Sequence, residues 1–294
     1  MQAHRPVLPF AVTLAGVGLF SLMDALMKGA SIAVGAYSAL LLRSVIGLAL
    51  IAPVWLATRK AWPARPAMRV HVTRGVVGAA MAFTFFWGLA RVPLAEGIAL
   101  SFIAPLIALY LAALLLGERI APRAIGASMM GLAGVVVIVL GRAGQGGWDA
   151  ETAWGTASIL SSSGLYAWNL VLQRQQSLLA SPVEVATFQM GVVGLVLALL
   201  SPALFEMPGR EAWPVIAAAA VLALGASMLF AWAYARAEAQ ALVPLEYSGF
   251  LWASLFGWWL FGEGLRLSVV VGAMLIVVGC WIAAPRKRPE QTAA

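Results

Sequence analysis

Ten long apolar runs separated by short polar breaks form the dominant pattern along this chain. Because about 20 apolar residues cross a bilayer as a helix, each run predicts a membrane-spanning helix. The first five spans are predicted at 7–27, 34–57, 70–90, 93–116 and 121–141. The second five are predicted at 152–173, 182–204, 213–235, 240–261 and 266–284. The breaks between them are too short to hold a soluble domain.

Landmarks of the first half return in the second half at an offset of 145 residues. Gly117-Glu118 closes one apolar run, and Gly262-Glu263 closes another. Two copies of an odd number of spans lie inverted relative to each other, and inverted repeats are typical of secondary transporters. We therefore divide the chain into two five-helix repeats, 1–144 and 145–294. The same offset relates Phe85, Trp87, Ala90 and Arg91 to Phe230, Trp232, Ala235 and Arg236.

Composition agrees with a membrane protein. Hydrophobic residues make up 62% of the 294 positions, charged residues make up 11%, and the mean hydropathy is +0.92. Soluble domains of this size do not combine these values. The long apolar runs predict an all-α integral membrane fold. The single cysteine, Cys280, excludes an intramolecular disulfide and a cysteine-based metal cluster.

Basic residues predict the orientation in the membrane. With the N-terminus inside, thirteen Lys and Arg residues fall on the cytoplasmic side and five on the other. Cytoplasmic loops carry the excess of basic residues, so both termini are expected in the cytoplasm. We expect a multi-pass protein of a bacterial-type inner membrane. The net charge of +7 lies in short loops, so no nucleic-acid partner is expected.

Motifs of common enzyme and pump chemistry are absent from the sequence. The chain has only two histidines, His4 and His71, and lacks HExxH, GxGxxG, P-loop and GxSxG patterns. We therefore expect no catalytic residue, no metal and no cofactor. The missing P-loop excludes an ATP-driven pump for this chain alone. The glycine-rich segment 144–147 is interpreted as a linker between the repeats.

Charges within the first two spans are candidate functional groups. A charge at the bilayer centre costs about 2.5–3.5 kcal/mol, so such groups normally face a polar cavity or a partner. Asp24 and Lys28 are four residues apart on one helix face, and Arg43 lies about two turns into the second span. Asp24 is expected to pair with Arg43 or Lys28. This pair is either a fixed structural ion pair or part of an outer gate or substrate contact.

Glu246 is the strongest acidic candidate in the second half. It lies just after Pro244 and immediately before Tyr247, in a predicted membrane span. We expect it to face a cavity; the alternative is a structural pair with Arg74 or Arg236. Burial can raise a carboxyl pKa toward neutrality, so Glu246 is also the candidate proton carrier.

Inversion of the repeats places further polar groups near both mouths. Asn169 and Gln189 occupy the positions equivalent to Asp24 and Ser44, and Ser101 is equivalent to Glu246. Glu118 and Glu263, which follow glycines at span ends, are interpreted as caps or loop anchors.

Prolines and small residues mark two further features of the spans. Pro105 and Pro244 interrupt helical hydrogen bonding at positions that are not equivalent, so the two gates need not bend alike. Small residues in the fifth and tenth spans allow close backbone approach and favour a scaffold pair or a dimer contact. Aromatic residues could line a pathway for small amphipathic solutes, although buried aromatics usually only pack. The aromatic candidates are Phe83, Trp87, Tyr166, Trp232 and Tyr247.

These motifs resemble the EamA family of the drug/metabolite transporter superfamily. The matching segments run from Ala90 to Gly97, from Ser101 to Pro105 and from Leu116 to Arg119, with a second copy from Pro244 to Glu263. The chain is similar in particular to the aromatic amino-acid exporters of that family. The resemblance implies two inverted halves around a central cavity lined by spans 1, 3, 4, 6, 8 and 9. Spans 5 and 10 would be peripheral.

The resemblance favours a secondary carrier that exports small metabolites, most plausibly amino acids with bulky or aromatic side chains, by alternating access. Asp24 or Glu246 would bind the ammonium group, Arg43 or Asn169 the carboxylate, and aromatic residues the side chain. One alternative is efflux of cationic drugs or nucleobase-like compounds. A more distant one is an intramembrane enzyme or lipid-handling protein. The expected partners are the small-molecule substrate and the lipid bilayer, with the protein a monomer or homodimer.

Overall fold

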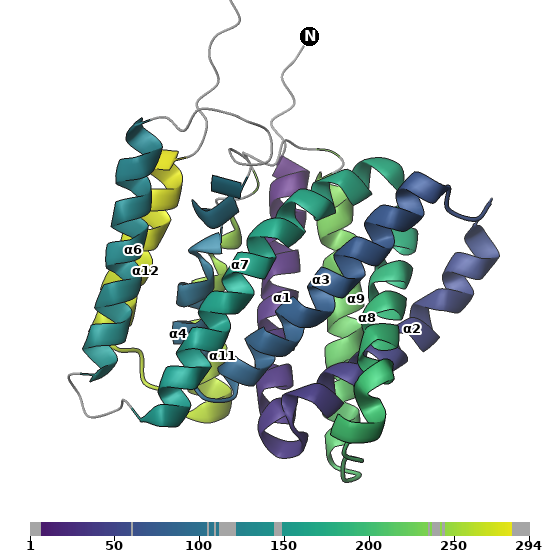
Figure 1. The fold of residues 1–294 in the computed structure, drawn as a ribbon, viewed down its shortest axis with the longest axis horizontal. Helices are drawn as coiled ribbons and strands as arrows, with labels where there is room; N and C mark the ends of the chain where they lie inside the picture. Colours follow the sequence, from purple (N-terminus) through teal and green to yellow (C-terminus); the bar gives the residue numbers. More distant parts are fainter. Residues whose placement is uncertain are drawn as a thin grey trace, which may run out of the picture.

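The computed structural model describes residues 7–59, 61–104, 106–108, 110–111, 122–143, 149–234, 236, 242 and 245–283. Within these residues the chain forms ten α-helices and no β-strand (Figure 1). The first repeat contains α1 (Val7–Val34), α2 (Ala36–Thr58), α3 (Arg65–Leu89), α4 (Leu94–Ser101) and α6 (Pro122–Ala143). The second contains α7 (Ala150–Leu179), α8 (Pro182–Leu204), α9 (Ala212–Tyr234), α11 (Gly249–Phe261) and α12 (Leu267–Ala283).

Five of these helices are long and apolar enough to cross a membrane by themselves. They are α1, α2, α3, α8 and α9. The described parts of α4, α6, α11 and α12 are apolar but shorter. Helix α7 has 30 residues, yet its sequence is more polar because it carries serines, an asparagine and glutamines. In a membrane bundle such a helix must place its polar side chains against other helices or in a polar space.

The helices end on two sides of the bundle. The amino-terminal side contains the start of α1 and the segments 61–64 and 180–181 (Figure 1). The distal side contains Gly35 and the segments 90–93, 205–211 and 262–266. Gly35 and Gly262 have φ values of 79° and 65°, a region that favours glycine, and allow the chain to leave α1 and α11 sharply.

The helix pairing follows the duplication in the sequence. Helix α1 packs against α9, and the repeat-equivalent pair α3 and α7 packs in the same way. Helices α2 and α8, which are equivalent to each other, also pack together, as do α6 and α12. This exchange of equivalent partners is the contact pattern of two related halves with inverted topology. The predicted inverted-repeat architecture is therefore confirmed.

Helices α6 and α12 form a separate pair at one edge of the bundle (Figure 1). Their backbones approach so closely that a Cβ on Gly134 would lie 2.5 Å from the carbonyl oxygen of Gly272. Only glycine allows this approach, which explains the small residues in these two spans. Because their small residues pack against each other, the structure favours the scaffold alternative for this pair.

Two spans that the sequence presents as continuous are interrupted. Helix α4 ends at Ser101 and is followed by a turn at Phe102–Ile103, and a turn at Tyr247–Ser248 precedes α11. These turns are 145 positions apart, so the two repeats break at the same place. The expectation that the two halves bend at different positions is therefore wrong. Pro105 and Pro244, on which it was based, lie outside the described residues.

Other predicted boundaries also shift. The first span continues to Val34 rather than residue 27, and the sixth extends to Leu179 rather than 173. Each extension consists of polar or small residues that are buried by neighbouring helices instead of facing lipid. Helix α7 begins at an N-cap in which Asp149 accepts a hydrogen bond from the Thr152 amide. Glu118 and the segment 144–147 lie outside the described residues.

Candidate functional site

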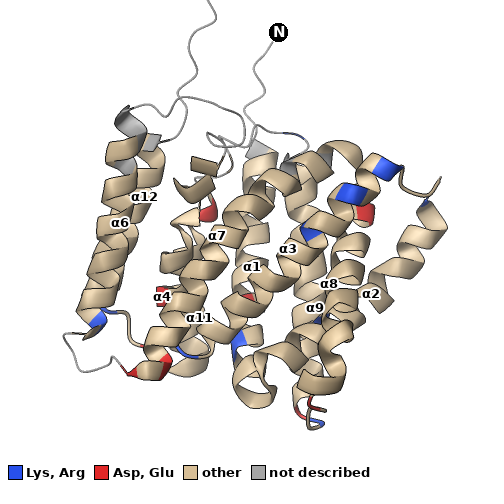
Figure 2. Cartoon of the chain, viewed as in Figure 1, with Lys and Arg blue, Asp and Glu red and all other residues tan. Residues whose placement is uncertain are grey.

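Polar groups of both charge signs meet in the middle of the bundle. The Tyr166 hydroxyl donates to Glu246 Oε2 at 3.4 Å, which joins α7 to the segment that precedes α11. Tyr166 also interacts electrostatically with Asp24 on α1 and Arg74 on α3. Tyr166, Glu246, Asp24 and Arg74 are all partly exposed, although they lie in apolar helical segments. We call these four residues the central cluster; Figure 2 shows such charged positions between the two charged ends of the bundle.

Arg74 of the central cluster is held by neutral amides. Its Nε donates to Asn169 Oδ1 at 3.2 Å, one terminal nitrogen donates to Gln173 Oε1 at 3.3 Å, and the other donates to Gln176 Oε1. The three amides come from α7, at positions i, i+4 and i+7, so they lie on one helix face. None of these acceptors carries a charge that would neutralise the guanidinium. The predicted alternative, a structural Arg74–Glu246 pair, does not account for these contacts.

Arg43 is enclosed more tightly than Arg74. It is 8% exposed, donates to Met23 Sδ at 3.1 Å and lies over the Phe86 ring, 5.5 Å from its centroid. Its Nε is buried without a hydrogen-bond partner. Asp24 and Arg43 interact electrostatically. The Asp24–Arg43 association is therefore long-range in this structure, without a hydrogen bond between the two side chains among the described contacts.

Lys28 does not pair with Asp24, so that predicted alternative is wrong. Its Nζ binds Glu263 and donates to the carbonyl oxygen of Val92 at 2.7 Å. Glu263 also accepts the Leu94 backbone N–H at 2.7 Å, which caps the start of α4. The carbonyl and carboxylate satisfy the buried ammonium better than a neighbour on its own helix face. Glu263 thus has the anchoring role expected from its Gly-Glu turn.

Further ion pairs join the distal ends of the helices. Glu96 at the start of α4 binds Arg142 at the end of α6, at 2.8 Å. Arg142 also donates to Thr152 Oγ1 at 3.4 Å, and Arg91 binds Glu151 at 2.7 Å. Together with Lys28–Glu263 we call these contacts the distal network. It connects both repeats and ties α1, α4, α6 and α7 to the segments at 90–93 and 262–266.

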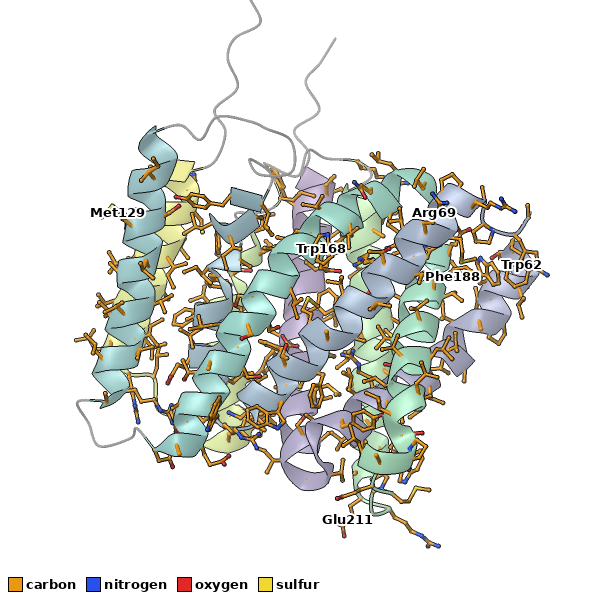
Figure 3. All side chains as sticks on the ribbon, in the orientation of Figure 1. Trp62, Arg69, Met129, Trp168, Phe188 and Glu211 are labelled. Atoms are coloured by element: carbon orange, nitrogen blue, oxygen red, sulfur yellow. The ribbon has the colours of Figure 1, made fainter. Side chains whose placement is uncertain are left out.

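The aromatic candidates occupy three kinds of position. Phe83 packs edge-on against Tyr37 of α2, with centroids 6.3 Å apart. Trp87 and Trp232 each lie under an arginine from the end of their own helix, at 3.5 and 4.2 Å. Tyr247 meets its repeat equivalent Phe102 edge-on at 5.1 Å, where both helices break. These contacts bring Tyr166 and Tyr247, but not the others, to the central cluster or its border. Trp168 points outward from α7 and is 44% exposed (Figure 3).

The remaining candidates are accounted for by local contacts. Ser101 donates to the Gly97 carbonyl oxygen at 2.9 Å, within the last turn of α4. Gln189 packs against Gly78 of α3, where a Cβ would lie 2.4 Å from its Nε2, and its Oε1 is buried without a partner. Asn169 is 4% exposed and holds Arg74. Of these three, only Asn169 therefore contacts the central cluster.

Sequence reasoning missed a second polar chain on the amino-terminal side. His71 Nε2 lies 3.1 Å from Glu184 Oε1, and the other ring nitrogen lies 2.6 Å from Gln176 Nε2. Gln176 in turn binds Arg74. The i, i+4, i+7 spacing of amides in an otherwise apolar run was the available signal for Gln173 and Gln176. Nothing local in the sequence points from His71 to Glu184, which lies 113 residues away.

A surface cavity lies away from the central cluster. It has a volume of about 360 Å³ and opens on the first two turns of α3. Its lining residues are Arg65, Met68, Arg69, Val72 and Thr73. It therefore shares no residue with the central cluster or the distal network. Among the residues that the structure describes, no three His, Cys, Asp or Glu side chains gather as a metal site.

The family comparison matches both halves of the chain. The model of the EamA-like transporter family matches residues 9–140 and again residues 153–284. The chain belongs to the EamA-like transporter family. The predicted resemblance is confirmed. Because EamA family members are transporters, this EamA protein is a membrane transporter of small molecules and not an enzyme. The alternative of an intramembrane enzyme is therefore wrong.

Named relatives of this EamA protein transport different metabolites. The pseudopaline exporter CntI of Pseudomonas aeruginosa strain UCBPP-PA14 is 30% identical over 268 residues, which cover 89% of this chain and 90% of the exporter. A riboflavin transporter of Rhizobium johnstonii is 28% identical, covering 70% of this chain and 67% of the relative. The aromatic amino acid exporter YddG of Ancylobacter novellus is 32% identical, covering 57% and 54%. These names indicate metabolite transport without fixing one substrate class.

A solved crystal structure supports the fold. It aligns with 94% of this chain and 96% of its own, with a TM-score of 0.63 and 22% sequence identity. At this identity the likeness concerns the fold alone.

Proposed function

We propose that this chain is a secondary-active transporter that exports small metabolites, above all amino acids with bulky or aromatic side chains, by alternating access. The observation that carries the proposal is the central cluster, in which two acids, an arginine and a tyrosine are partly exposed inside an apolar bundle. Charges at this depth are costly unless a polar space or a charged solute meets them. An amino acid brings one group of each sign and satisfies both.

The proposed binding mode assigns one group of the amino acid to each part of the cluster. Glu246 and Asp24 bind the ammonium, as both carboxyl side chains are partly exposed. Arg74 and Asn169 bind the carboxylate, because the Arg74 guanidinium is bonded to neutral acceptors only. Arg43 is less suited to this role because it is buried against Met23 and Phe86.

The aromatic pair beside the cluster supports a bulky side chain in the substrate. The Phe102 and Tyr247 rings meet where α4 and α11 are interrupted. Aromatic rings bind flat or bulky apolar groups, and the relatives include an aromatic amino acid exporter and a riboflavin transporter. We propose that the repeats 1–144 and 145–294 move relative to each other in a bacterial inner membrane, with both termini in the cytoplasm.

The test is uptake by proteoliposomes of labelled amino acids and other metabolites, with and without a proton gradient. We expect saturable transport of L-phenylalanine or L-tryptophan, and its loss in Glu246→Gln. The control is Glu211→Gln, since Glu211 lies in the segment between α8 and α9, away from the cluster (Figure 3). Unchanged transport and pH dependence in Glu246→Gln would remove Glu246 from the mechanism.

A second candidate is the efflux of cationic compounds. The observation in its favour is that the two acids of the cluster are partly exposed while Arg43 is buried. A cation would need Glu246 or Asp24 but not Arg74. Transport that depends on Glu246 and survives Arg74→Gln would favour this function over amino acid export.

A further inference from the structure

A hydrogen-bonded chain leads from the amino-terminal side to the central cluster. Glu184, at the start of α8, has 18% of its side chain exposed and lies 3.1 Å from Nε2 of His71, which is fully buried. The Nδ1 atom of His71 lies 2.6 Å from Nε2 of Gln176, whose Oε1 accepts from Arg74. Four side chains from α8, α3 and α7 are therefore connected in series.

The chemistry of Gln176 gives this chain a direction. An arginine only donates hydrogen bonds, so the amide must turn its oxygen toward Arg74. Its NH₂ group then faces His71, and Nδ1 must be the unprotonated acceptor. The proton of the neutral ring is consequently on Nε2, which donates to Glu184. One pattern of donors and acceptors satisfies all three contacts.

The surroundings of His71 contain few other groups that act on its charge. Phe188 of α8 stacks on the ring, with centroids 4.5 Å apart and an interplanar angle of 11°. Trp55 of α2 packs against Phe188 at 5.2 Å, and α7 presents the neutral Gln176. Among the described residues, the charged groups that interact with His71 are Glu184 and Arg74. The ring is fixed in place, so a change in its protonation must be met by its hydrogen-bond partners.

We propose that His71 positions Arg74 through Gln176, and that protonation of His71 releases one side of the Arg74 guanidinium for the carboxylate of the transported solute. One proton from solution binds Nδ1, and the resulting imidazolium stays paired with Glu184. The Nδ1–H then faces the Gln176 NH₂ group, which puts two donors in contact. The amide rotates by a half-turn, accepts from His71 and turns its NH₂ group toward Arg74. Arg74 loses that acceptor and keeps Asn169 and Gln173.

This inference rests on the proposed function and adds a proton dependence to it. Histidine is the side chain that ordinarily changes its charge between about pH 5 and pH 8. Solutes with a carboxylate are therefore expected to bind more tightly as the pH falls, since a free N–H donor appears on Arg74. A charge-assisted hydrogen bond of this kind corresponds to about a tenfold change in affinity.

The first experiment reads the ring itself and needs no substrate. The sequence has only His4 and His71, so His4→Ala leaves one histidine signal in the full chain. Nitrogen NMR of the ¹⁵N-labelled protein in detergent should show the Nε2–H tautomer at neutral pH. In Gln176→Leu this tautomer preference should weaken, because no amide then donates to Nδ1. An Nδ1–H tautomer in the parent protein would overturn the proposal.

The second experiment measures L-phenylalanine binding to the full chain in detergent at about pH 8 and about pH 6. The parent protein should bind about tenfold more tightly at the lower pH. Gln176→Leu should abolish this dependence. The matched control, Gln173→Leu, also removes an acceptor of Arg74 but does not contact His71, so it should weaken binding and keep the pH dependence. Equal loss of pH dependence in both variants would overturn the proposal.

The two experiments separate this inference from the function on which it rests. If L-phenylalanine does not bind at either pH, amino acid transport falls, whereas the tautomer of His71 still decides whether the hydrogen-bonded chain has the stated direction. If L-phenylalanine binds without pH dependence in the parent protein, amino acid transport stands and the role of His71 is refuted.

Discussion

The two sides of the bundle are built on the same backbone plan but are joined by different chemistry. The distal side is closed by ion pairs of Lys and Arg with carboxylates: Lys28–Glu263, Glu96–Arg142 and Arg91–Glu151. On the amino-terminal side, the described polar contacts join Arg74 to neutral amides and His71 to Glu184. Ion pairs of Lys and Arg persist over the physiological pH range, whereas a His–Glu pair is charged only when the histidine is protonated.

The sequence explains why the distal network is not repeated on the other side. At the offset of 145 residues, Lys28 corresponds to Gln173 and Glu96 corresponds to Ala241. In the opposite direction, His71 corresponds to Ile216. Duplication thus preserved the helix packing while the groups between the helices diverged. In alternating access, opening the distal side must separate lasting ion pairs, and opening the other side must rearrange amides and a protonatable pair.

Lys28 offers the strongest test of this difference. Lys28→Met should lower the free energy of unfolding by about 3 kcal/mol, because it leaves Glu263 partly buried without its cation. The distal side should also open more often. The measurements are thermal unfolding in detergent and labelling of a cysteine at Val92, which is 2% exposed, in a Cys280→Ala background.

The control for Lys28 removes both partners. Lys28→Met combined with Glu263→Gln should recover part of the lost stability, since no uncompensated charge remains. Recovery should be incomplete because Glu263 also caps the start of α4. If Lys28→Met unfolds like the parent protein and the Val92→Cys site stays unlabelled, the Lys28–Glu263 pair does not hold the distal side closed.

Burial should decide which of the other distal ion pairs contributes. Glu96→Gln should cost about 2 kcal/mol, because the Glu96 side chain is 2% exposed and bonded to Arg142. Glu151→Gln removes a comparable carboxylate from a side chain that is 71% exposed, and should cost about 0.5 kcal/mol or less. Unfolding of both variants in the same detergent tests this order. Equal losses would show that burial does not determine the contribution of these pairs.

The aromatic contact between Phe102 and Tyr247 lies between the two sides and should couple them. A double-mutant cycle with Phe102→Leu and Tyr247→Leu should give an interaction energy of about 1 kcal/mol, as expected for an edge-on pair. The four proteins are compared by thermal unfolding. A coupling energy near zero would mean that the two rings contribute independently and do not join the repeats.

The sequence predicted the helices well because their apolar runs are local signals. It also predicted the inverted pairing, because the offset of 145 residues is visible without a structure. The interruptions at Phe102 and Tyr247 were missed, since the residues on both sides of each break are apolar and give no local signal. The equal spacing of these two aromatics was the clue that would have placed them together.

The contacts of the charged residues were predicted less well. The i, i+4 spacing of Asp24 and Lys28 favours a local pair, but the packing of α1 brings Glu263 to Lys28 over a separation of 235 residues. Such a partner depends on the packing of several helices and cannot be read from spacing. Asn169 was identified from its equivalence to Asp24, and the structure places it on Arg74.

The arginines that follow Trp87 and Trp232 give the smallest and most direct comparison of the two sides. Arg91 and Arg236 are repeat equivalents, and each lies over its tryptophan, at 3.5 and 4.2 Å. Arg91 also binds Glu151, whereas Arg236 is exposed. Arg91→Gln should therefore cost about 1 kcal/mol and Arg236→Gln about 0.5 kcal/mol, with the difference reduced by added salt. Thermal unfolding at low and high salt measures both variants. A larger loss for Arg236→Gln would contradict the conclusion that charge pairing is stronger on the distal side.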